Sequence, residues 1–218
     1  MLKVSAIITA AGKNSRMRKE QMERNIPLQN KLTLPFNSST IIETTINNVL
    51  NTGNIDECIV VLGHFSDEIL PLINKIDDSR LKIIENDPVD VGLSVSLLNG
   101  LSCIKSDIAL CVTGDQPTVS TKTFNSILDC ILKSKNPKNT ISILRRLKTG
   151  KLDTAEGLGM PFAASRLELI DYLDGKDDNL NPILREMFAD GFDFYGIEED
   201  DPLELININT YSEYESIL

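Results

Sequence analysis

The sequence has few of the residues and patterns on which several protein classes depend. It contains one histidine, His64, which follows an apolar segment and has no convincing partner for a catalytic triad. We therefore interpret His64 as a structural or supporting residue. No run of about 18 apolar residues is present, the length that a transmembrane helix requires. The amino terminus also lacks the charged, apolar and cleavage regions of a signal peptide, so we expect no membrane contact.

Cysteine and positive charge are scarce as well. The four cysteines show no C-x-x-C spacing and lie in apolar periodic segments, which predicts buried, reduced thiols and a cytoplasmic location. Lys and Arg number 22 against 32 Asp and Glu, a net charge of −10. Binding to a nucleic-acid duplex needs a basic face, so we expect no nucleic-acid partner. The acidic run at 198–201 is interpreted as a solvated loop rather than a metal cluster.

The length and composition are typical of one soluble α/β domain. The chain has 218 residues, of which 41% are hydrophobic and 25% charged, close to the average for globular proteins. A chain of this length can bury a substantial core, and no repeat or low-complexity linker divides it. We expect a single domain over 1–218 that is a monomer or a weak homo-oligomer.

Apolar strands alternate with amphipathic helices in the first half of the chain. Segments without polar alternation predict strands buried on both faces at 3–9, 57–62, 81–85 and 107–113. Apolar stripes predict helices at 41–50, 69–76, 94–103 and 124–132. This alternation predicts an α/β fold with a doubly wound, mostly parallel sheet and helices on both faces, a Rossmann-like arrangement. Ligands gather at the carboxyl ends of the strands in such sheets.

The second half of the chain is less regular. Weaker patterns predict strands at 139–144 and 160–164, helices at 168–173 and 182–188, and a last short helix after 203–209. Asp177 and Asp178 are expected to cap the helix that starts near Asn181, because carboxylates accept hydrogen bonds from the free N–H groups of a first helical turn.

The first predicted strand ends in a loop of small and basic residues. Ala10, Ala11 and Gly12 let a ligand approach the backbone closely, and backbone N–H groups in such a loop can cradle phosphate oxygens. Arg16 adds a fork of donors that matches a phosphate. The loop is neither G-x-G-x-x-G nor G-x-x-x-x-G-K-[ST]. Taken alone, it is equally consistent with a glycine-bearing turn and a surface arginine.

Two further residues fit the chemistry of phosphate transfer. Lys31 lies fifteen residues past Arg16, and Asp115 follows the fourth predicted strand. Attack of an acceptor phosphate on the α-phosphorus of an NTP brings anions together, and basic side chains with Mg²⁺ neutralise them. Arg16 and Lys31 are therefore the candidate catalytic residues, and Asp115 is the candidate metal ligand. The alternatives are a solvated lysine at 31 and a turn residue at 115.

Motifs along nearly the whole chain resemble one family. AAG-x₂-SRM at 10–17, NKL-x-LP at 30–35, NDPVDVGLSVSLLNGL at 86–101 and GDQP at 114–117 resemble the MobA-like nucleotidyltransferases, and most closely the molybdenum cofactor cytidylyltransferases. GMPF at 159–162 and NINT at 207–210 resemble two weaker motifs of that family. Arg18 replaces a usual glycine, and residues 18–30 form a longer insertion. Asn207 and Asn209 stand where the family prefers Asp.

The resemblance implies a Mg²⁺-dependent enzyme that transfers a nucleoside monophosphate from an NTP and releases pyrophosphate. The implied site comprises Ala10, Ala11, Gly12 and Ser15 at the base and phosphates, Gly92, Ser94 and Ser96 near the nucleoside, and Asp115 with Asn207, in a late strand, at Mg²⁺. Asn209 is the alternative second ligand. The AAG opening favours CTP, and the first hypothesis for the small phosphorylated acceptor is molybdopterin. A sugar phosphate or other alcohol phosphate is the alternative acceptor. A non-catalytic nucleotide-binding paralogue is the alternative to an enzyme.

Overall fold

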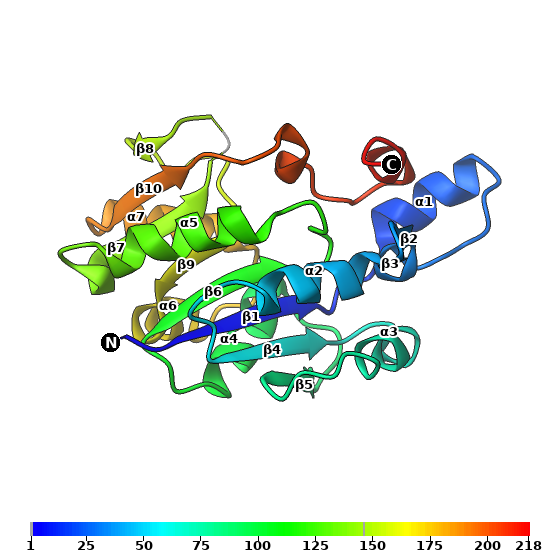
Figure 1. Cartoon of the computed structure of the whole chain (residues 1–218), viewed down its shortest axis with the longest axis horizontal. Coiled ribbons are helices and arrows are strands. Elements are labelled where there is room, and N and C mark those ends of the chain that lie inside the picture. Colours follow the sequence, from blue (N-terminus) through cyan, green and yellow to red (C-terminus); the bar gives the residue numbers. More distant parts are fainter. Residues whose placement is uncertain (1, 146) are drawn as a thin grey trace.

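One eight-stranded sheet organises the computed structural model, which describes residues 2–145 and 147–218 (Figure 1). The strand order is β5-β4-β1-β6-β9-β7-β10-β8. Four strands pair in parallel, namely β1 (Val4–Ala10), β4 (Glu57–Leu62), β5 (Leu81–Glu85) and β6 (Ile108–Thr113). The chain runs from β1 outward to β5 and returns to place β6 on the other side of β1. The predicted strands and the mostly parallel sheet are confirmed.

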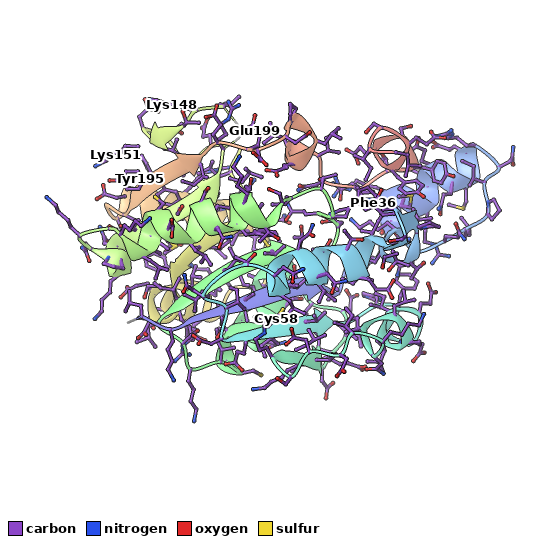
Figure 2. The ribbon with its side chains drawn as sticks, in the orientation of Figure 1. Phe36, Cys58, Lys148, Lys151, Tyr195 and Glu199 are labelled. Carbon is purple, nitrogen blue, oxygen red and sulfur yellow. The ribbon has the colours of Figure 1, made fainter. Side chains whose placement is uncertain are left out.

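The other half of the sheet mixes strand directions. Its strands are β7 (Thr140–Leu144), β8 (Gly150–Lys151), β9 (Phe162–Ser165) and β10 (Asp193–Ile197). β9 runs antiparallel to both β6 and β7 and so joins the two halves, whereas β10 runs parallel to β7. Figure 2 shows Lys151 and Tyr195, which face each other in the β8–β10 register, at the opposite end of the molecule from Phe36. The sequence patterns did not predict β8 or β10.

Helices cover both faces of the sheet (Figure 1), which explains the absence of polar alternation in its strands. Three helices lie on one face, α2 (Ile41–Leu50), α3 (Ser66–Ile73) and α5 (Thr121–Leu132). Three more lie on the other, α4 (Leu93–Ser102), α6 (Arg166–Leu173) and α7 (Leu180–Ala189). Neighbouring side chains of β1 point to opposite faces: Ile8 packs with α2, and Ile7 packs with α4.

The helix starts follow local side-chain chemistry in some places and tertiary contacts in others. α2 begins at a capping box, in which Thr40 and Glu43 satisfy each other's backbone N–H groups. The predicted caps of α7 are wrong. Its N-cap is Asn179, and Asp177 instead accepts a hydrogen bond from the backbone N–H of Gly92 at 2.6 Å. Asp177 therefore joins the start of α7 to the start of α4.

Several elements near the first loop and the carboxyl terminus were not predicted. Helix α1 (Ser15–Glu23) carries no apolar stripe, because only Met17 and Gln21 are buried. A short hairpin, β2 (Pro35–Phe36) with β3 (Ser39–Thr40), and a 3₁₀ turn, η1 (Lys31–Thr33), follow it. The late strand expected at Asn207 is absent from the described chain. Instead a 3₁₀ turn, η3 (Pro202–Leu205), leads through extended residues to α8 (Tyr211–Glu215), which is the predicted last short helix.

Two predictions about burial need correction, one for the cysteines and one for the acidic run at 198–201. Cys58 on β4 (Figure 2) is buried, and burial raises the pKa of its thiol to about 12, but Cys103 is exposed and Cys130 is half-buried. The acidic run is not simply solvated, because the Glu199 side chain is only 9% exposed and pairs with Arg145. Among residues 2–145 and 147–218, no helix combines the length and the apolar character that a membrane span needs.

Gly100 sets how closely α4 approaches the sheet. A Cβ at this position would lie 2.6 Å from Ile7 Cγ2 and 3.0 Å from Val61 Cγ2. We expect Gly100→Ala to lower the melting temperature, since overpacking of this kind costs about 1–3 kcal/mol and the helix gains only about 1 kcal/mol from alanine. Ser102→Ala, on the exposed end of α4, is the control and should not lower it. Equal melting temperatures for both variants would contradict the close packing.

Candidate active site

The carboxyl ends of β1 and β6 open into a cleft of about 820 Å³. The strand order reverses at this point, and parallel α/β sheets leave a ligand-binding crevice where that happens. Ala10, Ala11 and Gly12 line the cleft from the end of β1, and Gly114 and Asp115 line it from the end of β6. The predicted small-residue loop and the predicted metal ligand are therefore neighbours.

Asn14 joins the first loop to the segment that carries Lys31. Its backbone is left-handed, with φ at 57°, a conformation that asparagine tolerates better than most residues. Its side chain donates to the carbonyl of Gln29 at 3.0 Å and accepts from the backbone N–H of Lys31 at 3.3 Å. Asn14 thereby brings the two ends of the segment between the first loop and Lys31 together. The sequence patterns did not identify this role.

The structure brings the predicted basic pair and the predicted metal ligand together. The Lys31 ammonium donates to the Asp115 carboxylate and to Asn209 Oδ1, the latter at 3.2 Å. Arg16 donates to the same Asn209 oxygen at 2.8 Å. The Lys31 and Asp115 side chains are only 17% and 11% exposed, so water screens their attraction less than at an open surface. Asn209, rather than Asn207, contacts both cations.

Asn207 is held by a buried glutamine. The side chain of Gln116 is fully buried and donates to Asn207 Oδ1 and to the carbonyl of Met160, both at 2.9 Å. Its own oxygen accepts from the backbone N–H of Thr113 at 3.3 Å. Gln116 thus links the end of β6 to two other segments that line the cleft. It is the third residue of the GDQP motif, which is the signal that could have identified it.

The oxygen atoms around Asp115 fit a hard cation. Asp115 Oδ1 is buried and has no hydrogen-bond partner within the described chain, and the same holds for Thr113 Oγ1. The amide groups of Asn207 and Asn209 line the same cleft. One carboxylate with one or two amide oxygens is a donor set that suits Mg²⁺, which also keeps water and takes phosphate oxygens. The residues present therefore fit a magnesium ion bound together with a phosphorylated ligand.

Two further segments line the cleft. One is 157–160, and the other is the start and middle of α7, which contribute the polar side chains of Asn179, Asn181 and Arg185 beside the apolar Leu180 and Pro182. Arg185 forms no ion pair with residues 2–145 or 147–218. Of the described residues lining the cleft, three are basic and Asp115 is the acidic one. The cleft is therefore positively charged in a protein whose net charge is −10, and this favours anionic ligands.

Comparison with known proteins identifies the family. The profile of the MobA-like NTP transferase domain matches residues 6–166. The chain belongs to this family. A nucleotidyl transferase from Methanothermobacter thermautotroptrophicus is 44% identical, with a TM-score of 0.90 over 99% of this chain and 95% of that chain. The resemblance stated from the motifs is confirmed, and the chain is an enzyme of the nucleotidyltransferase class.

Two other relatives are more distant. The molybdenum cofactor cytidylyltransferase of Escherichia coli (strain K12) is 29% identical over 127 residues, or 58% of this chain, and the match spans 59% of that relative's length. A Mycobacterium tuberculosis H37Rv protein, whose structure was determined in complex with manganese, shares the fold at 19% identity and a TM-score of 0.67. That alignment covers 100% of this chain and 98% of that chain.

Only some of the residues predicted to lie near the nucleotide line the cleft of this transferase. Ser96 lines the cleft, where its hydroxyl accepts from Asn86 at 2.9 Å. Gly92 and Ser94 are not among the described residues that line the cleft: the fully buried Ser94 hydroxyl donates to the carbonyl of Lys176 at 2.9 Å and accepts from the N–H of Asp178 at 2.8 Å. A further residue, Ser15, is exposed on the first turn of α1. Ser94 therefore connects two segments of the transferase.

The first loop of the transferase is also held from β4. A Cβ on Gly63 would lie 2.7 Å from the Ala11 Cβ, so the two backbones meet closely. The backbone N–H of His64 donates to the Ala11 carbonyl at 3.3 Å. Lys13 pairs with Asp90 at 2.6 Å, and this contact lowers the pKa of the Asp90 carboxyl. The loop is thus fixed from two sides.

Ser94 and Ser96 should respond differently to alanine. We expect Ser94→Ala to lower the melting temperature, because the buried hydroxyl bonds two partly buried backbone groups, and losing such a partner costs up to about 1–3 kcal/mol. The further stabilisation produced by an NTP with Mg²⁺ should be retained in Ser94→Ala and reduced in Ser96→Ala. Thermal melts with and without nucleotide measure both effects. A loss of the nucleotide effect in Ser94→Ala alone would return Ser94 to the nucleotide site.

Proposed function

We propose that this transferase moves CMP from CTP to a small phosphorylated acceptor and releases pyrophosphate. The observation that carries the proposal is the cluster of Arg16, Lys31, Asp115 and Asn209 beside the first loop. A phosphate oxygen of the acceptor attacks the α-phosphorus of CTP and forms a new P–O bond. The bond from the α-phosphorus to the oxygen bridging it to the β-phosphate breaks, and its electron pair leaves with pyrophosphate.

The chain's own residues then have distinct tasks. The first loop, at 10–12, binds the nucleotide through its backbone. Arg16 and Lys31 stabilise the negative charge that develops on the phosphate oxygens, and they are fixed in advance by Asn209 and Asp115. Asp115 with Asn207 or Asn209 would hold Mg²⁺. When bound, this ion supplies further positive charge to the phosphates and orients them.

Arg185 on α7 is the proposed contact for the acceptor. It lines the cleft with Asn179 and Asn181 and has no ion-pair partner in the described parts of the chain. A guanidinium presents paired donors that match a phosphate or carboxylate. The partial similarity to the molybdenum cofactor cytidylyltransferase supports molybdopterin as the acceptor, and the same relative, with the AAG opening of the first loop, supports CTP as the donor.

A sugar phosphate or other alcohol phosphate is the second candidate acceptor. The described residues that line the cleft include no aromatic side chain, and planar rings such as a pterin gain from stacking on one. Hydrogen-bonding amides and an arginine suit a hydroxyl-rich acceptor instead. A single domain over 1–218, a cytoplasmic location and a monomeric or weakly oligomeric state stay predictions.

A pyrophosphate-release screen tests the reaction and its substrates. Four NTPs with Mg²⁺ are combined with molybdopterin and a panel of sugar and alcohol phosphates. We expect CTP to give the fastest release, and Lys31→Ala or Arg16→Ala to lower turnover about 10²-fold, the usual effect of removing charge stabilisation. Fastest release with GTP or UTP would contradict the CTP assignment. NTP binding without release in any combination would favour a non-catalytic nucleotide-binding paralogue.

Carboxylate substitutions distinguish the two candidate amide ligands of Mg²⁺. We expect Asp115→Asn to abolish Mg²⁺-dependent turnover without unfolding the protein. Asn207→Asp should keep or raise activity and lower the half-saturating Mg²⁺ concentration, because it adds an anionic oxygen ligand. Asn209→Asp should instead strengthen its contacts to Arg16 and Lys31, because hydrogen bonds to a charged acceptor are stronger. Mg²⁺ titrations of activity distinguish the two ligands. If only Asn209→Asp lowers the half-saturating Mg²⁺ concentration, Asn209 is the ligand.

A further inference from the structure

One face of α1 contacts the C-terminal segment at three successive points. Arg16, Glu20 and Arg24 are spaced four residues apart, so they lie on the same side of the helix and its C-cap. Arg16 contacts Asn209, Glu20 contacts 211–212, and Arg24 contacts 212 and 215. Figure 1 shows α1 and the C-terminal helix side by side at one end of the molecule. The insertion that begins at residue 18 therefore builds two of the three contacts.

Glu20 completes the amino-terminal cap of α8. Its carboxylate accepts from the backbone N–H of Tyr211 at 2.8 Å and of Ser212 at 3.3 Å, and from the Ser212 hydroxyl. The third N–H of the helix, on Glu213, donates to the Thr210 hydroxyl at 3.2 Å. These bonds satisfy three N–H groups that lack a partner within the helix. They also lower the pKa of Glu20, with the Ser212 hydroxyl as the main cause.

Arg24 holds the other end of α8. Its guanidinium makes two hydrogen bonds to the Glu215 carboxylate, at 2.8 and 3.1 Å, and lies over the Tyr211 ring at 5.1 Å. Both charged side chains are more than a third exposed, and surface pairs of this kind contribute little stability. A helix of five residues is too short to be stable alone. The position of α8 therefore depends on its contacts with α1, on the core packing of Tyr214 and Ile217, and on the bond from the Tyr214 hydroxyl to the carbonyl of Pro35 at 2.8 Å.

The cap of α8 continues directly to the active site. The Glu213 carboxylate accepts from the backbone N–H groups of Asn209 and Thr210 at 2.7 and 2.8 Å. The preceding residue, Ile208, donates its N–H to the Asp115 carbonyl at 3.3 Å. Asn209 therefore lies between the anchor at Asp115 and the anchor that Glu20 makes through α8. A shift of α8 moves the Asn209 amide relative to Arg16 and Lys31.

We propose that Glu20 and Arg24 are positioning residues for the Asn207–Asn209 segment, and that this is the role of the 18–30 insertion. Neither residue lines the cleft, so they act through α8 and Asn209. The catalytic consequence rests on the proposed function, because it assumes that the amides of this segment act at the phosphates and Mg²⁺. The structural consequence is that α1 holds 207–215 in place, and this part is independent of the proposed function.

The matched variants Glu20→Ala and Glu23→Ala test the proposal. Both replace a glutamate of α1 by the best helix former, but Glu23 is exposed and contacts Lys19 rather than α8. In Glu20→Ala, we expect the amide hydrogens of Tyr211 and Ser212 to exchange about tenfold faster, as expected for the loss of a helix cap. The half-saturating Mg²⁺ concentration for CTP turnover should rise about fivefold or more, since tuning of metal sites by supporting groups is of this size or larger. Glu23→Ala should change neither.

A charge reversal provides the second test. Arg24→Glu should raise exchange at 211–215 and the half-saturating Mg²⁺ concentration, and Arg24→Glu with Glu215→Arg should restore both, because the ion pair is rebuilt in the opposite sense. Equal exchange in Glu20→Ala and Glu23→Ala overturns the proposal whatever the activity. Faster exchange with unchanged Mg²⁺ dependence overturns the positioning role. A wild-type protein that releases no pyrophosphate with any acceptor overturns the proposed function but leaves the exchange test to decide the structural part.

Discussion

The ammonium group of Lys31 connects three segments that are far apart in the sequence. It lies on η1 and donates to Asp115 at the end of β6 and to Asn209 near the carboxyl terminus. Both charged side chains are mostly buried, and removing one partner of such a pair costs more than the pair itself contributes, because an uncompensated charge is left behind. Asn14 accepts from the backbone N–H of Lys31, and Arg16 donates to its partner Asn209, so both support the position of this one cation.

Charge is distributed unevenly between the cleft and the rest of the surface. The chain as a whole carries a net charge of −10, yet the cleft lining includes Arg16, Lys31 and Arg185 against Asp115 alone among the described residues. Many acidic residues elsewhere lie in ion pairs, as Glu199 does with Arg145 (Figure 2). A locally positive cleft in an acidic protein restricts anion binding to the place where the first loop can orient it.

The first half of the fold could be predicted because its strands are buried on both faces. The continuous apolar runs of β1, β4 and β6 have no other explanation in a chain of this composition. Helix α1 could not be predicted, since its sequence SRMRKEQME buries two side chains and its exposed polar stripe contacts α8 instead of a core. β8 and β10 were missed because a two-residue strand and the segment DFYGI carry too little pattern to be recognised locally.

The residues alone were enough to predict the class of protein, and most of the site residues that they predicted line one cleft. The first loop and the GDQP motif follow β1 and β6, and the ends of neighbouring parallel strands meet at one edge whatever the loops do. Sequence patterns could not show that Asn209 contacts both Arg16 and Lys31, that Ser94 bonds the backbone at 176 and 178, or that Arg185 lines the cleft. Those outcomes depend on where α7, α8 and the C-terminal segment pack, and packing between distant segments leaves no periodic signal in the residues themselves.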